Sequence, residues 1–97
     1  MIEPGDLFMV DLNEERHRRV LVVSQARFNR LSGRVLVAPT IKLAVSARHA
    51  PWHIHIGDDW FALHLIRSIA AERLTKSVGR APADTVAAVR RAVAELL

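Results

Sequence analysis

The stretch that decides the fold is Arg18-Arg19-Val20-Leu21-Val22-Val23-Ser24, which is apolar and mostly β-branched after its two arginines. A strand with apolar residues on both faces belongs in the middle of a sheet, where it is covered from two sides. Residues 35–41 form a second segment of this kind, and Pro39 within it cannot donate to a sheet ladder, so it marks a strand end, an edge or a bulge. These two segments predict the centre of one sheet.

Shorter segments outside this centre complete an α+β pattern. Strands are expected at 6–12, 52–56, 60–70 and 75–79, a hairpin tip at 13–16, a short helical step at 25–31 and a loop at 42–50. The clearest helix follows Pro82, because Val86, Val89, Val93 and Leu96 recur at spacings of three and four. The sequence therefore predicts one domain over residues 1–97, a compact barrel-like sheet with a C-terminal helix.

The composition narrows the class of protein without naming a function. The chain has 97 residues, 51% of them hydrophobic, and no cysteine, so disulfides and thiolate metal sites are excluded. Twelve of the fourteen basic residues are arginines and the net charge is +4, which permits binding to nucleic acid without requiring it. No apolar run approaches the ~20 residues that span a membrane, and the start lacks a signal-peptide pattern. We therefore expect a cytoplasmic protein with no membrane contact.

Several short motifs stand in an order that is informative as a set. They are Pro4-Gly5-Asp6, Arg18 to Ser24, Phe28-Asn29-Arg30, Val37-Ala38-Pro39, Ile66-Arg67-Ser68-Ile69 and Val78-Gly79-Arg80. Together they resemble the MazF/PemK toxin family of small endoribonucleases over nearly the whole chain. The resemblance implies a small SH3-like, CcdB-type β-barrel with a C-terminal α-helix. It also implies a homodimer, a single-stranded RNA substrate cleaved without metal or cofactor, and a cognate antitoxin protein as partner.

The same resemblance assigns the catalytic residues. Arg18 falls on the family's catalytic arginine. The family's catalytic hydroxyl stands two residues after its proline, whereas Thr40 follows Pro39 by one, and His64 occupies the place of an acidic residue. Cleavage by the RNA 2′-hydroxyl needs a base, a cation beside the phosphorane and an acid for the leaving oxygen. Arg18, Thr40 and His64 are therefore the predicted catalytic residues.

Four further residues are predicted to bind RNA: His17, Arg19, Asn29 and Arg67. Arg67 has an equally good alternative as an ion-pair partner of Glu72. Trp52 and Trp60 either stack on bases or pack between strands. The histidines at 53 and 55 are a weak zinc signal, and a half-exposed strand face explains them better, so no metal site is expected.

Two other functions compete with RNA cleavage. Residues 51–60 resemble a strand-turn-strand of the CcdB toxins, which poison DNA gyrase. Those toxins need a terminal Trp-Gly-Ile, whereas this sequence finishes Ala94-Glu95-Leu96-Leu97. The other alternative is a catalytically degenerate barrel that binds RNA or an antitoxin, since Thr40 is offset and the acidic residue is missing.

Overall fold

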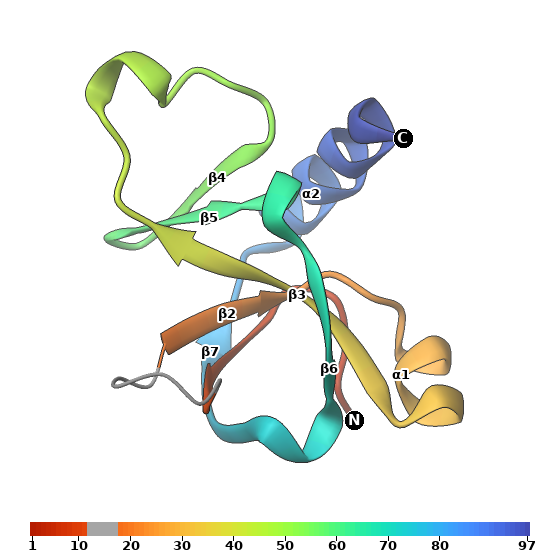
Figure 1. The fold of residues 1–97 in the computed structure, drawn as a ribbon. Helices are drawn as coiled ribbons and strands as arrows, with labels where there is room; N and C mark the ends of the chain where they lie inside the picture. Colours follow the sequence, from red (N-terminus) through yellow and green to blue (C-terminus); the bar gives the residue numbers. More distant parts are fainter. Residues whose placement is uncertain (12–17) are drawn as a thin grey trace.

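The computed structural model describes residues 1–11 and 18–97, and these form one antiparallel sheet with a helix at each of two places (Figure 1). The strands are β1 Asp6–Val10, β2 Arg18–Val22, β3 Arg34–Ile41, β4 His53–Ile56, β5 Asp59–Ala62, β6 Arg67–Ala70 and β7 Leu74–Arg80. The helices are α1 Ala26–Ser32 and α2 Ala83–Leu96, and the 3-10 turns are η1 Val45–Ala47, η2 Leu63–Leu65 and η3 Ala71–Arg73. The strand order is β4-β5-β3-β2-β1-β7, and β6 also pairs with β3. This confirms the predicted α+β class and the barrel-like sheet.

The two central strands are covered on both faces, as the sequence predicts. Leu21 of β2 and Ala38 of β3 pack in one cluster with Val89 and Ala92 of α2. The alternate residues of the same strands join a second cluster, made of Val10, Val20, Val22, Val35, Val37 and Ile69. Because side chains alternate along a strand, these clusters lie on opposite faces of β2 and β3.

The predicted single strand over residues 60–70 is wrong, because η2 divides it into β5 and β6. Both pieces lie along the same edge of β3: Thr40 is opposite Phe61, and Val37 is opposite Arg67. The Leu36 carbonyl accepts a hydrogen bond from the Val23 amide, so every second residue of β3 counted from Leu36 directs its backbone polar groups toward β2. Pro39 belongs to the other alternation, and its backbone nitrogen points to the opposite edge of β3. At that edge the proline, which has no N–H, faces the gap between β5 and β6, where no ladder partner is needed.

Several element ends differ from the prediction by one or two residues. The first strand ends at Val10, the last extends over Leu74–Arg80, and the predicted 42–50 loop contains η1. Pro82 is the N-cap of α2 rather than its first residue, and Leu96 is exposed although the rest of its stripe faces the sheet. The predicted hairpin tip at 13–16 lies outside the described residues. Among the parts of the chain that are described, no helix has the length and apolar character to cross a membrane.

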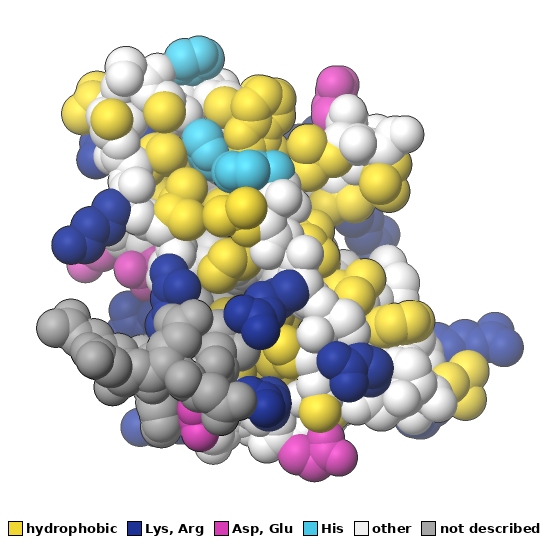
Figure 2. All heavy atoms as spheres, viewed as in Figure 1, with side chains coloured by type: hydrophobic (Ala, Val, Ile, Leu, Met, Phe, Trp, Pro, Cys, Tyr) yellow, Lys and Arg dark blue, Asp and Glu magenta, His cyan; other side chains and the backbone are white. Residues whose placement is uncertain are grey.

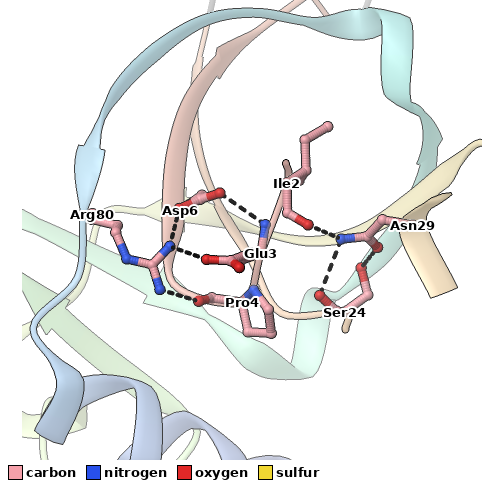
Figure 3. Close-up of polar contacts among 7 residues, drawn as sticks. All are labelled: Ile2, Glu3, Pro4, Asp6, Ser24, Asn29 and Arg80. Atoms are coloured by element: carbon pink, nitrogen blue, oxygen red, sulfur yellow. Dashed lines mark hydrogen bonds and ion pairs between the residues drawn. The ribbon is translucent and has the colours of Figure 1, made fainter. Parts of the chain in front are cut away.

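The motif Pro4-Gly5-Asp6 is held by polar contacts with Arg80 at the end of β7 (Figure 3). The Asp6 carboxylate accepts from the Glu3 amide at 2.8 Å and pairs with Arg80, which also contacts Glu3. Gly5 has φ +96°, and a Cβ built there would lie 2.5 Å from Cγ2 of Val86. This glycine is therefore required both by its backbone conformation and by the close approach of the helix.

Candidate active site

Arg18 and Thr40 are in direct contact. Nη2 of Arg18 donates a hydrogen bond of 2.7 Å to the main-chain carbonyl of Thr40. The regular pairing of β2 with β3 ends at Val20 and Pro39. The Thr40 carbonyl is the next one that points toward β2, and the Arg18 guanidinium takes the place of a backbone donor there. The half-buried Arg18 is thus held at a fixed place at the start of β2.

The side chains of Arg18 and Thr40 belong to opposite faces of the sheet. Arg18 lies on the same face of β2 as Val20, whose partner on β3 is Pro39. Thr40 lies on the other face, opposite Phe61, and Phe61 belongs to the cluster beneath α2. β3 keeps a regular register on β2 up to Pro39, so no bulge there turns the Thr40 hydroxyl toward Arg18. The contact between the two residues is made by the Thr40 carbonyl, not by the hydroxyl on which the sequence prediction rested.

Other polar and aromatic side chains share the face of Arg18. By register this face carries Arg67, which is opposite Val37, and Trp60, which is opposite Ile41. His55 is opposite Trp60, and His53 alternates with His55. Figure 2 shows histidine side chains gathered on one side of the molecule, with hydrophobic side chains between them and a group of lysine and arginine side chains. We call the surface formed by Arg18, His53, His55, Trp60, His64 and Arg67 the Arg18 face.

His64 lies in η2 and joins this face through its ring contacts. Its ring centroid is 5.4 Å from that of His53 and 6.3 Å from that of Trp52, both in edge-on arrangements. Nδ1 of His53 donates to the Ala47 carbonyl at 2.8 Å, whereas His64 is exposed and no hydrogen bond joins its ring to the described residues. The structure thus brings Arg18 and Thr40 together and places His64 in a neighbouring aromatic cluster.

Asn29 is not an exposed RNA contact, and this sequence prediction is corrected. Its side chain is buried, accepts from the Ser24 hydroxyl and donates to the carbonyls of Ile2 and Ser24 at 3.0 and 3.2 Å (Figure 3). All of its polar atoms are therefore used inside the protein. Asn29 ties α1 to the end of β2 and to the start of the chain.

The remaining predicted RNA contacts have separate environments. Arg19 lies on the face opposite Arg18 and forms an ion pair of 3.1 Å with Asp59 of β5. Arg67 is exposed on β6, and within residues 1–11 and 18–97 it forms no ion pair with Glu72. His17 lies outside the described residues.

Sequence reasoning missed two features of this region. It did not find the partner of Arg19, because Asp59 is forty residues away along the chain. It also missed the parallel stack of His55 on Trp60, with ring centroids 4.5 Å apart and planes at 4°, and Arg48 lying 5.6 Å from the Trp60 ring. The glycine at position 57 could have indicated this stack. It marks a two-residue hairpin turn, and such a turn places residue 55 directly opposite residue 60. In the described ranges no three His, Asp or Glu side chains converge as metal ligands.

Comparison with known proteins identifies the class of protein. A family model described as the PemK-like, MazF-like toxin of type II toxin–antitoxin systems matches residues 3–97. The chain belongs to this family, and it is therefore a toxin of the type II class. This confirms the resemblance found in the sequence, and nothing in the comparisons supports the gyrase-directed alternative.

Solved structures share the fold. An endoribonuclease in complex with its cognate antitoxin from a mycobacterial species has a TM-score of 0.83 at 18% identity, covering 98% of this chain and 93% of that one. A MazE–MazF structure from Deinococcus radiodurans has a TM-score of 0.81 at 22% identity, covering 98% and 94%. A second crystal form of that complex has a TM-score of 0.72 at 26% identity, covering 98% and 93%. No protein with a curated description matches the sequence significantly.

Proposed function

We propose that this toxin is a sequence-specific endoribonuclease that cleaves single-stranded RNA without a metal and thereby inhibits translation. The observation that carries the proposal is the Arg18 guanidinium, held by the Thr40 carbonyl at the start of a central strand in a member of the MazF/PemK family. Relatives of the same fold include a mycobacterial endoribonuclease. A fixed guanidinium suits this reaction because it stays charged and matches the geometry of phosphate oxygens.

The reaction follows from RNA chemistry. The 2′-oxygen attacks the adjacent phosphorus and gives up its proton to a base, and the bond from phosphorus to the 5′-oxygen breaks as that oxygen receives a proton. The products are a 2′,3′-cyclic phosphate and a 5′-hydroxyl. Arg18 stabilises the charge on the phosphorane oxygens, which is the largest contribution expected from one group at such a site.

His64 is our candidate for proton transfer, since it is exposed on the Arg18 face and its ring forms no hydrogen bond with the described residues. The test is a pair of variants, His64→Ala and His53→Ala. His53 is the matched control, because its Nδ1 is already committed to the Ala47 carbonyl. A loss of cleavage of about 10²-fold or more is expected for His64→Ala alone. Full cleavage by His64→Ala would remove it from the mechanism.

The partners proposed for the chain follow from its class. Its substrate is single-stranded RNA, its protein partner is a cognate antitoxin, and it works in the cytoplasm as a homodimer. An antitoxin segment with acidic residues would complement the exposed Arg67 and the half-buried Arg18 of the Arg18 face and compete there with RNA.

The deciding experiment is cleavage of a long single-stranded RNA in EDTA by wild-type protein and by Arg18→Ala. We expect cuts at a short motif that leave 2′,3′-cyclic phosphate ends, and their loss in the variant. There is a second candidate function, a barrel that binds RNA without cutting it. It is favoured by the orientation of Thr40, which lies opposite Phe61, so its hydroxyl is on the face away from Arg18. Folded wild-type protein that binds the RNA and leaves it intact would establish that candidate instead.

A further inference from the structure

A row of side chains crosses three strands on the Arg18 face. Ile41 of β3 lies opposite Trp60 of β5, and Trp60 lies opposite His55 of β4. Arg18 stands beside this row: the regular pairing of β2 with β3 ends at Val20 and Pro39, and Nη2 of Arg18 binds the carbonyl of Thr40, the residue before Ile41. Neighbouring strands are about 4.8 Å apart, so Arg18 and Trp60 are separated by a distance on the order of 10 Å.

At the far end of this row two aromatic rings are stacked face to face. The rings of Trp60 and His55 are stacked with their planes only 4° apart, and His55 is exposed while Trp60 is half-buried. The guanidinium of Arg48 lies 5.6 Å from the Trp60 ring centroid. The stack also lines an open groove of about 570 Å³ at the edge of β4, whose walls include Arg48 and His49 on one side and Asp84 and Arg91 of α2 on the other. Aromatic rings beside cations are the two components by which proteins bind unpaired nucleotides.

A contact on the opposite face links the strand of Arg18 to the hairpin of the stack. Arg19, the neighbour of Arg18, pairs with Asp59, the neighbour of Trp60, at 3.1 Å. This exposed ion pair joins β2 to the β4–β5 hairpin across β3. The cation and the aromatic rings are therefore connected through their neighbours, although they come from segments forty residues apart.

We propose that the Trp60–His55 stack is a base-binding platform for a nucleotide next to the phosphate held by Arg18. This inference rests on the proposed function, since it places the scissile phosphate at Arg18. The span from Arg18 to the stack is on the order of three nucleotides at the ~3.4 Å rise of a stacked strand, and fewer when the bases are unstacked and the strand is extended. Stacking tolerates any base, so the platform supplies affinity and position, while hydrogen bonds elsewhere select the sequence.

The first test compares Trp60→Leu, Trp60→Phe and Phe28→Leu in cleavage of a short RNA oligonucleotide. Phe28 is the control, because it is also a partly exposed aromatic residue, at 42%, but lies on α1, away from the row. Loss of one stacked base is expected to raise KM roughly tenfold with Trp60→Leu. Trp60→Phe should restore most of the affinity, and Phe28→Leu should leave KM unchanged. Circular dichroism establishes that each variant is folded.

The second test does not depend on cleavage. In a Trp52→Phe, Arg18→Ala protein, Trp60 is the sole tryptophan, so its fluorescence reports directly on stacking. A single-stranded RNA oligonucleotide should quench it, and an abasic nucleotide at one position should abolish the quenching. Quenching without any cleavage by wild-type protein would overturn the proposed ribonuclease activity and leave the platform standing. An unchanged KM in Trp60→Leu, or no quenching by RNA that binds, would overturn the platform.

Discussion

Nη2 of Arg18 lies 2.7 Å from the main-chain oxygen of Thr40, so the position of the guanidinium does not depend on which side chain residue 40 carries. A carbonyl at this place is present for any residue, whereas a hydroxyl must also point to the correct face. The contact explains how the one-residue offset of Thr40 from the family pattern is compatible with an ordered arginine. Because the contact uses the main chain of residue 40, a substitution of the Thr40 side chain can be tested without removing the support of Arg18.

The first prediction concerns Arg18→Lys, which keeps the charge and removes the planar fork. An ammonium group cannot bind the Thr40 carbonyl and two phosphate oxygens in the same fixed geometry. We expect the single-turnover rate of RNA cleavage to fall about 10²-fold or more, while the free energy of unfolding changes by about 1 kcal/mol. Arg90→Lys, on the exposed side of α2, is the control. Equal rates for Arg18→Lys and wild type would contradict a role for the fork.

The second prediction concerns Thr40→Val, which removes the hydroxyl and preserves shape and carbonyl. Since the hydroxyl faces the Phe61 side of the sheet, cleavage should stay within about threefold of wild type, a barrier change of less than ~1 kcal/mol. The measurement is the single-turnover rate at saturating RNA. A hundredfold loss would mean that the hydroxyl turns toward the phosphate when RNA binds, and Thr40 would then be catalytic as the sequence predicted.

The third prediction compares two glycines with positive φ. Gly5→Ala places a methyl 2.5 Å from Val86 at φ +96° and should lower the free energy of unfolding by about 3 kcal/mol. Gly33→Ala, at φ +69° with nothing within 4 Å, should cost only about 1 kcal/mol. Urea unfolding of both variants measures the difference. Similar losses would show that α2 moves away from the start of β1 without cost.

The fourth prediction concerns Asn29→Ala. The substitution removes the acceptor of the Ser24 hydroxyl, which keeps only the Leu36 amide as donor, and removes the donor to the Ile2 carbonyl, so it should destabilise the protein by about 2–3 kcal/mol. Because Asn29 is buried, the KM for RNA of the folded variant should equal that of wild type. A raised KM with unchanged urea stability would restore Asn29 to the RNA-binding residues.

Local patterns in the sequence predict the centre of this fold well. Val20 to Val22 and the stripe of α2 are apolar at the spacing that their surroundings require, so period and composition suffice there. The division of residues 60–70 was missed because it depends on β3. Phe61 pairs with Thr40 and Arg67 pairs with Val37, so six positions along the chain from Phe61 to Arg67 face only three positions of β3. Three residues between Phe61 and Arg67 must therefore leave the ladder, which only these pairings show.

The site divides in the same way. Arg18 could be predicted as a site residue because its resemblance to a family motif is local. The role of Asn29 was misjudged, because a polar residue in a motif gives no sign of burial when its partners, Ser24 and Ile2, lie on other segments. The face on which each arginine lies follows from strand register, which one sequence does not reveal when the strands meet through β3.

The last prediction uses this difference of faces between two exposed arginines, Arg67 and Arg19. Arg67 shares the face of Arg18, so Arg67→Gln should raise the KM for RNA and lower the slope of log affinity against log salt by about one. Arg19 is turned to the other face and paired with Asp59, so Arg19→Gln should leave the salt slope unchanged and cost less than about 1 kcal/mol of stability. Binding of an uncleaved oligonucleotide at several salt concentrations measures both. If Arg19→Gln reduced the slope as much as Arg67→Gln, RNA would have to contact both faces of the sheet.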